Sequence, residues 1–111
     1  MAGRIARGEV RFYTFAAPDK QRPVLILTRP AILDYLAAIT IAPITSTIRG
    51  VHSEVILTEA DGMKARCAVN LLNVTSVNRE RIGRRITQLN AARMSEICDA
   101  LRFAVGCDSV E

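Results

Sequence analysis

The side chains best suited to chemistry are polar residues at the expected ends of strands and in the loops between them. They are Arg22, Thr45, Ser46, Thr47, His52, Glu54 and Asn73. Binding residues of small domains gather on such segments. A guanidinium offers fixed donors to a phosphate, and hydroxyl and amide groups can hold a polar substrate. Each of these residues is a weak signal by itself.

His52 and Glu54 are two residues apart on a segment that we expect to be a strand, so their side chains should share one face. Either could act as a general acid or base if that face borders a groove. The plainer interpretation is that both are exposed residues at the edge of a loop. The sequence leaves both interpretations open.

Motifs for metals, nucleotides and disulfides are missing from the sequence. It contains no phosphate-binding or dinucleotide-binding glycine motif, no zinc-protease motif and no paired Cys/His cluster, so we expect no metal and no cofactor. Cys67, Cys98 and Cys107 are odd in number and widely spaced, which favours reduced thiols. We also expect a cytoplasmic protein without membrane contact, because neither a secretory leader nor a spanning stretch is evident.

The charge balance favours a phosphate-bearing or acidic partner. Fifteen Lys and Arg against eleven Asp and Glu give a net charge of +4, and most of the basic residues are arginines. They are spread along the chain and form no basic tail. The fold must therefore assemble any basic binding surface.

Short hydrophobic segments predict a mainly β protein. Residues 9–15 alternate as in a half-buried strand, with Val10 on one face and Glu9 and Arg11 on the other. Residues 23–28 are apolar on both faces, which indicates a central strand. Further strands are expected at residues 37–45, 53–58 and 64–70, the last two joined as a hairpin around Asp61-Gly62, with a short helical or irregular piece at 31–35.

One amphipathic helix is expected at the C-terminal end. Asn90 is a good N-cap, Gly106 is a natural C-cap, and apolar residues recur between them at helical spacing. Five or six short strands closed by such a helix favour a small barrel. The length of 111 residues fits one domain, with residues 1–6 and 108–111 expected to be flexible.

Three segments resemble the MazF/PemK family of toxin endoribonucleases from type II toxin–antitoxin systems. Residues 7–10 read R-G-E-V, residues 21–28 read Q-R-P-V-L-I-L-T and residues 42–46 read A-P-I-T-S, in the family's order. Residues 70–77, N-L-L-N-V-T-S-V, look like the later strand pair of the family. Two departures are Arg11, where relatives commonly have an aromatic residue, and a short connection over 15–21. The recognition sequence therefore cannot be carried over from a relative.

The resemblance implies a site as well as a fold. It places the catalytic pair on Arg22 and Thr45, and contacts to RNA on Gln21, Ser46, Thr47 and Asn73. Without the resemblance, Arg22 would be read as an ion-pair partner of Asp19 or Glu9. RNA can be cut by its own 2′-hydroxyl if a protein aligns that group and stabilises charge on the phosphate, which suits an arginine and a hydroxyl. An obvious general base is missing from this pair.

The resemblance also implies a small SH3-like barrel of the MazF, CcdB and Kid type. Its implied partners are single-stranded RNA, a second copy of the chain, and an acidic antitoxin that competes for the RNA grooves and through which the complex reaches DNA. Because CcdB-like toxins share this fold, a non-enzymatic toxin that binds DNA gyrase is an alternative function, and a non-catalytic RNA-binding barrel is another.

Overall fold

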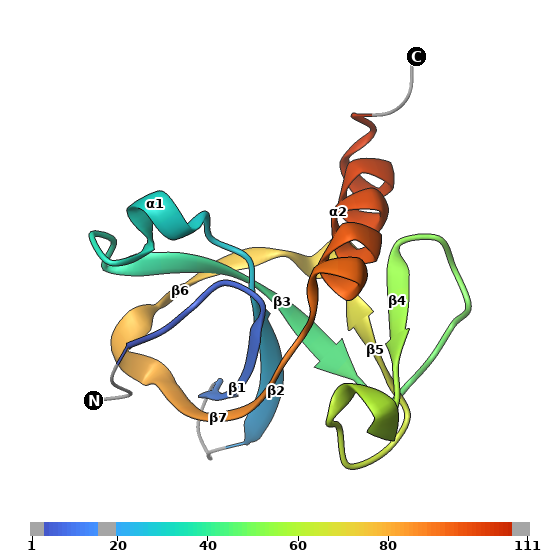
Figure 1. Cartoon of the computed structure of the whole chain (residues 1–111), viewed down its shortest axis with the longest axis horizontal. Helices are drawn as coiled ribbons and strands as arrows, with labels where there is room; N and C mark the ends of the chain where they lie inside the picture. Colours follow the sequence, from blue (N-terminus) through green and yellow to red (C-terminus); the bar gives the residue numbers. More distant parts are fainter. Residues whose placement is uncertain (1–3, 16–19, 108–111) are drawn as a thin grey trace.

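A curled antiparallel sheet with a helix at its C-terminal end forms the protein (Figure 1). The computed structural model describes residues 4–15 and 20–107. Its strands are β1 (Glu9–Thr14), β2 (Gln21–Ile26), β3 (Ala38–Thr45), β4 (Glu54–Leu57), β5 (Cys67–Asn70), β6 (Thr75–Asn78) and β7 (Ile82–Gln88). Its helices are α1 (Pro30–Leu33), α2 (Ala91–Val105) and three 3-10 turns, η1 (Glu59–Asp61), η2 (Leu71–Asn73) and η3 (Arg79–Arg81).

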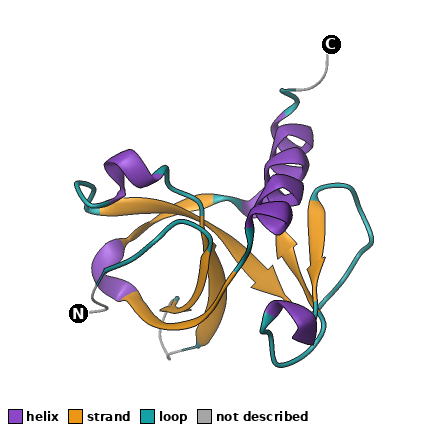
Figure 2. Cartoon of the chain, viewed as in Figure 1, coloured by secondary structure: helices purple, strands orange, loops and turns teal. Residues whose placement is uncertain are grey.

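The strands follow the order β4-β5-β3-β2-β1-β7, and β6 pairs with β3 beside this path. Every pairing is antiparallel. β3 is central because its first four residues pair with β6, Ile41–Pro43 pair with β2 and its last two residues pair with β5. Figure 2 shows the strands curling through the molecule, with α2 between the curled part and the β4–β5 hairpin and the shorter helical turns at the periphery. The predicted mainly β class with a C-terminal helix is confirmed.

Two hydrophobic cores lie on opposite faces of β2 and β3. Leu25 and Ala42 belong to the first core, which α2 covers through Ile97. Their sequence neighbours Ile26 and Ile41 belong to the second core. Alternate residues point to opposite faces of a strand, so a segment buried on both faces must be apolar throughout. The prediction of a central strand at residues 23–28 is thereby confirmed.

Helix α2 begins and ends where its caps predict. The Asn90 side chain accepts a hydrogen bond from the Arg93 amide at 2.8 Å, and Gly106 takes the left-handed conformation with φ 75°. Such caps bind the amide and carbonyl groups that a helix end leaves unpaired. Ile97 and Ala100 are buried, whereas Val105 is 62% exposed. The apolar face therefore packs on the first core from Met94 to Ala104, and only the very end of the helix projects beyond it.

The prediction that β1 is half-buried with a polar outer face is wrong. Glu9 and Arg11 are 6% and 4% exposed and pair with each other at 2.8 Å. Arg11 also donates to the carbonyl of Gly83 at 2.9 Å, and Glu9 accepts from the amide of Ala6 at 2.9 Å. Buried charges are tolerated when they are paired and hydrogen-bonded, which an alternation pattern does not reveal.

Three other local predictions differ from the structure. The hairpin is confirmed, but β4 and β5 are joined by a longer segment, residues 58–66, that contains η1. Gly62, with φ 91°, ends this 3-10 turn. His52 lies in the turn before β4 and is no part of the strand. Residues 70–77 form the end of β5, η2 and most of β6.

Strand β7 was not predicted from the sequence. It pairs with β1, yet only Ile82 of its residues is buried. Consecutive exposed arginines, Arg84 and Arg85, interrupt the apolar alternation that would have identified it.

Near the other end of the chain, Ile5 is 3% exposed and packs in the second core. Residues 1–3 and 108–111, which belong to the segments expected to be flexible, lie outside the described residues.

Candidate active site

Strands β2 and β3 bring Arg22 and Thr45 to one edge of the sheet. Val24 pairs with Pro43 at the end of the β2–β3 ladder, and Arg22 and Thr45 each lie two residues beyond this pair. Arg22 is exposed at the start of β2, and Thr45 is half-buried as the last residue of β3. On the strand side of the pair, the buried residues Val24 and Ile44 hold the backbone in the core. The two side chains are therefore presented by rigid elements.

A groove of about 460 Å³, called the first groove here, opens on one side of this pair. It is lined by Phe15, Arg22, Pro43, Ile44, Thr45, Thr47, Arg49, Glu54, Asn70 and Asn73. An aromatic ring and two amides are the groups that stack on and hydrogen-bond to an unpaired base. The first groove therefore has the chemistry of a base-recognition site.

A second groove, of about 480 Å³, opens on the other side of the pair. It is lined by Lys20, Gln21, Arg22, Pro23, Ile44, Thr45, Ser46, Met63, Lys64, Ala65, Arg66 and Cys67. Among residues 4–15 and 20–107, only Arg22, Ile44 and Thr45 line both grooves. The predicted catalytic pair thus stands where the two grooves meet.

The loop that follows β3 is held by side-chain hydrogen bonds. The Thr45 hydroxyl oxygen accepts from the Thr47 amide at 3.0 Å, and one Glu54 oxygen accepts from the amides of Arg49 and Gly50 at 3.0 Å each. Gly50 has φ 72°, a conformation that favours glycine. Because its oxygen accepts, the Thr45 hydroxyl keeps its own proton free to donate to a phosphate.

The structure brings most of the predicted site residues together. Gln21 and Ser46 line the second groove, and Thr47, Asn73 and Glu54 line the first. His52 is different, because it lines a hollow against α2 and its ring lies 5.4 Å from that of Phe103. Of the two acid–base candidates, only Glu54 borders the groove that contains Arg22.

Arg22 has no carboxylate partner within residues 4–15 and 20–107. The Glu9 carboxylate is taken by Arg11 at 2.8 Å and approached by Arg85 at 3.8 Å. This finding rules out pairing with Glu9, which was one of the two structural explanations considered for Arg22. Asp19, the other partner considered, lies outside the described residues. A guanidinium without a protein anion next to it can bind an anion of the substrate.

Several groove residues were not identified from the sequence: Phe15, Arg49, Lys64, Arg66 and Asn70. They come from separate places along the chain, so no spacing connects them. Cys67 also lines the second groove, and burial raises the pKa of its thiol. A neutral, buried thiol is a poor nucleophile.

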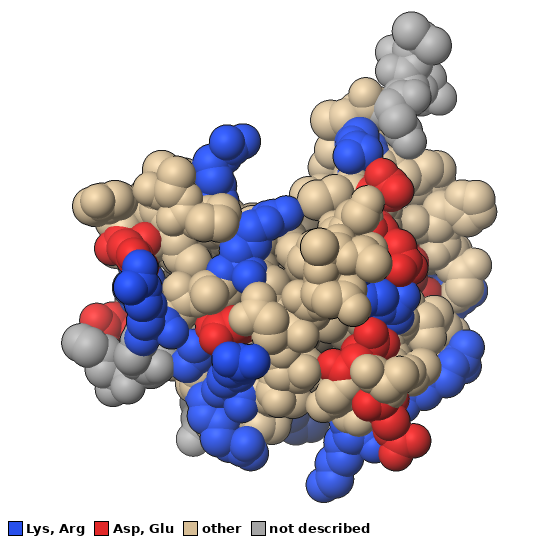
Figure 3. All heavy atoms as spheres, viewed as in Figure 1, with Lys and Arg blue, Asp and Glu red and all other residues tan. Residues whose placement is uncertain are grey.

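Charge is unevenly distributed over the surface. On the face drawn in Figure 3, basic side chains spread over the left half and the lower edge, while acidic ones run in a line below the exposed side of α2. Glu96 and Asp99 of α2, together with Glu54, line the hollow next to His52.

Among the described residues, no three His, Cys, Asp or Glu gather closely enough to hold a metal ion. No helix in the described part is long and apolar enough to cross a membrane.

A curled sheet with two grooves that meet at an arginine and a threonine is the fold and the site that the sequence resemblance implies. A sequence model described as PemK-like, MazF-like toxin of type II toxin–antitoxin system matches residues 6–105. The chain belongs to this family, and the resemblance seen in the sequence is confirmed.

Relatives and solved structures agree with this assignment. The chain is 43% identical over 103 residues to the probable endoribonuclease MazF5 of Mycobacterium tuberculosis, covering 92% of this chain and 94% of the relative. It is 40% identical over 102 residues to the probable endoribonuclease MazF2 of the same organism, covering 91% and 98%. The solved structure of M. tuberculosis toxin MazF-mt6 superimposes with a TM-score of 0.81 at 31% identity, covering 88% of this chain and 96% of that one.

A mycobacterial endoribonuclease solved in complex with its cognate antitoxin has the same fold, with a TM-score of 0.83 at 23% identity, covering 93% of this chain and 96% of that one. Together, the curated relatives named as endoribonucleases favour the nuclease branch of the fold over the gyrase-binding branch.

Proposed function

We propose that this protein, a MazF-type toxin endoribonuclease, cuts single-stranded RNA at the point where its two grooves meet. The observation that carries the proposal is the position of Arg22 and Thr45, the only polar residues in the described part of the chain that line both grooves. A strand lying along the grooves would pass its backbone over this pair. The cleaved phosphate would then rest against a free guanidinium and a hydroxyl.

The proposed reaction uses the nucleophile that RNA itself carries. The 2′-oxygen attacks the adjacent phosphorus, the bond from phosphorus to the 5′-oxygen breaks, and the products end in a 2′,3′-cyclic phosphate and a 5′-hydroxyl. Arg22 stabilises the charge that develops on the non-bridging oxygens, because its donors stay protonated at any working pH. Thr45 donates its hydroxyl proton to one of these oxygens and so orients the phosphate.

Protons must also leave the 2′-oxygen and reach the departing 5′-oxygen. Glu54 is our candidate base, since among the described residues it is the carboxylate that borders the first groove, and the departing 5′-oxygen takes its proton from water. One of its oxygens is used by the amides of Arg49 and Gly50, and the other is available to a substrate. Gln21, Ser46, Thr47 and Asn73 are proposed to bind the RNA on either side of the cut.

The finer account of partners is part of the proposal. An acidic antitoxin segment would compete with RNA for the grooves, because both are polyanions and the chain carries a net charge of +4. We further propose that the toxin works in the cytoplasm as a homodimer and contacts DNA only through its antitoxin.

The test is cleavage of a long single-stranded RNA in excess chelator by the wild-type protein, Arg22→Ala and Arg22→Lys. Arg22→Ala should lose cleavage by a factor on the order of 1,000 or more, because a transition-state contact is removed. Arg22→Lys should retain part of the cleavage activity, since lysine keeps the positive charge but lacks the forked donors of arginine. Arg29→Gln is the matched control, because Arg29 is exposed and lines neither groove.

Arg22 is exposed, so the variants should keep the thermal midpoint of the wild type. Cleavage by a folded Arg22→Ala at the wild-type rate would contradict the proposed role of this residue. Intact RNA after incubation with the folded wild type would contradict the whole proposal.

A further inference from the structure

The second groove differs from the first in its charge. Four exposed cations line it, Lys20, Arg22, Lys64 and Arg66, and no carboxylate does among the described residues. The first groove contains two arginines and the carboxylate of Glu54. Apart from Arg22, the cations of the second groove come from outside the segments that identified the family.

These cations are not used in holding the fold together. Within the part of the chain that the structure describes, the side chains of Lys20, Lys64 and Arg66 make no ion pair or hydrogen bond, in contrast to arginines such as Arg11 and Arg93. Like charges brought together around a hollow repel each other unless an anion lies between them. The arrangement is therefore that of a binding surface for a polyanion.

The segment that carries Lys64 and Arg66 is anchored at its base. Arg93 of α2 binds Asp61 through two hydrogen bonds of 2.9 and 3.0 Å, and the Thr87 hydroxyl donates to the Asp61 carbonyl at 2.9 Å. Gly62 sits so close to Thr87 that an added Cβ would lie 2.3 Å from its hydroxyl oxygen. In Figure 1 the arrowhead of β3 ends beside this segment. The two cations thus extend from a fixed support next to Thr45.

We propose that the second groove binds the RNA backbone, and that Lys64 and Arg66 bind phosphates of the RNA on one side of the cleaved bond. The first groove then reads the bases on the other side. This division follows from the groups present, because lysine and arginine without aromatic neighbours bind the backbone irrespective of sequence. The inference rests on the proposed cleavage of RNA and adds which part of the strand each groove holds.

The experiment measures binding and cleavage separately. The Kd is obtained with an RNA that carries a single 2′-deoxy nucleotide at the cut, which the protein binds without cleaving. The KM and kcat are obtained with the all-RNA strand. Lys64→Gln and Arg66→Gln are compared with the control Arg29→Gln, each with an RNA centred on the cut and with RNAs trimmed on the 5′ or the 3′ side.

Each groove variant should raise the Kd and KM of the centred RNA about three- to tenfold and leave kcat unchanged. The slope of log K against log salt should fall by about 0.7 for each phosphate that the variant no longer neutralises. The effect should vanish with one of the two trimmed RNAs, which identifies the side that the second groove holds. The control should bind all three RNAs as the wild type does.

An unchanged Kd and salt slope in both groove variants would overturn the inference, as would an equal effect with all three RNAs. A fall in kcat at constant KM would also overturn it, because backbone binding away from the cut does not change the chemical step. Failure of the proposed function itself looks different, since the wild type would then cut no RNA at all.

Discussion

Arg22 and Thr45 both line the two grooves, and each lies two residues beyond Val24 and Pro43, the last paired residues of two antiparallel strands. The two residues are far apart in the sequence. Their positions are fixed because the strands that carry them continue into buried residues of the core. A catalytic pair built on strands is held more accurately than one built on loops. The strand register is therefore the structural basis of the proposed site.

Thr45→Ala should reduce kcat by a factor on the order of 100, because it removes one donor to the phosphate in the transition state. Thr45→Ser keeps the hydroxyl and should retain most of the activity. Single-turnover cleavage of a short RNA measures the effect. Equal rates for the alanine variant and the wild type would show that the hydroxyl has no part in the reaction.

Glu54 can be tested for two different roles with two substitutions. Glu54→Gln keeps an oxygen that accepts from the amides of Arg49 and Gly50, but it cannot take a proton. If Glu54 is the base, as proposed, kcat should fall about 100-fold or more in Glu54→Gln.

The matched control is His52→Gln, which removes the other acid–base candidate. His52 packs against Phe103 and lines the hollow near α2, so the rate should stay within about twofold of the wild type at every pH. Full activity in Glu54→Gln together with low activity in Glu54→Ala would instead assign Glu54 to holding the loop.

The Asp61–Arg93 contact should make stability depend on pH in the acid range. Hydrogen bonds from the Arg93 guanidinium lower the pKa of Asp61 in the folded protein. The ionised carboxylate is therefore favoured by folding, so its contribution is full above the pKa of the unfolded chain, about 3.9, and is lost as the pH falls through the lower folded value. Asp61→Asn should lower the free energy of unfolding by about 2 kcal/mol at pH 7.

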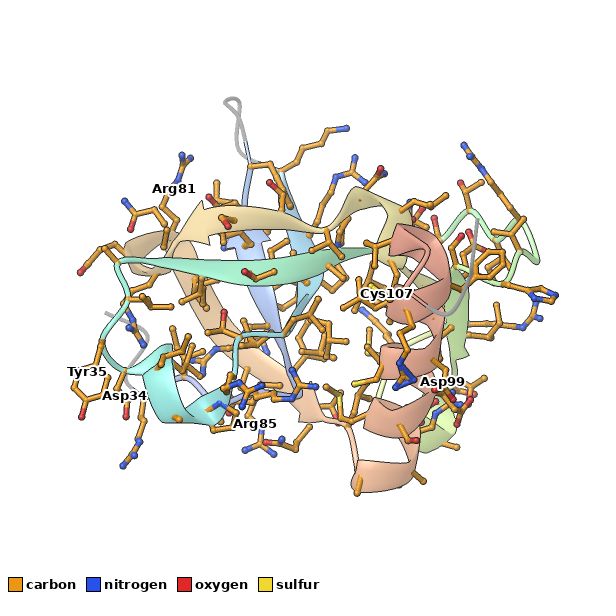
Figure 4. The ribbon with its side chains drawn as sticks, turned by 90° about the horizontal axis from the view of Figure 1, so that it is seen from above. Asp34, Tyr35, Arg81, Arg85, Asp99 and Cys107 are labelled. Carbon is orange, nitrogen blue, oxygen red and sulfur yellow. The ribbon has the colours of Figure 1, made fainter. Side chains whose placement is uncertain are left out.

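Urea unfolding of both proteins from pH 7 down to about pH 2.5 measures this difference, which should shrink below about pH 4. Asp99→Asn is the control, because its ion pair with Arg102 is on the exposed side of α2 and a change within about 0.5 kcal/mol is expected. Figure 4 shows Asp99 on α2, on the opposite side of the view from Tyr35. A difference between wild type and Asp61→Asn that stays constant over this pH range would contradict the assignment.

The parts of the fold that the sequence predicts are those with one dominant local cause. Asn90 and Gly106 bound α2 because they bind its unpaired ends, and residues 23–26 lie in the central strand β2 because both their faces are apolar. Strand β7 was not predicted, because its stability comes from pairing with β1 and its surface carries Arg84 and Arg85.

The site was predictable only in part. Arg22 and Thr45 were found by resemblance, since each would otherwise be an ordinary strand-end residue. Lys64 and Arg66 reach the second groove only because residues 58–66 form a long connection anchored on α2. His52 lies away from Arg22 because the strand begins two residues later, at Glu54. Contacts made by tertiary structure leave no local pattern in a single sequence.

The most direct test of the proposed mechanism is the fate of an RNA whose cut nucleotide lacks the 2′-hydroxyl. The mechanism predicts that the wild-type protein binds this strand as tightly as the all-RNA strand but leaves it intact, while the all-RNA strand yields a 2′,3′-cyclic phosphate and a 5′-hydroxyl. Cleavage of the 2′-deoxy strand at the same bond, or a 5′-phosphate on the product, would show that another nucleophile attacks the phosphorus.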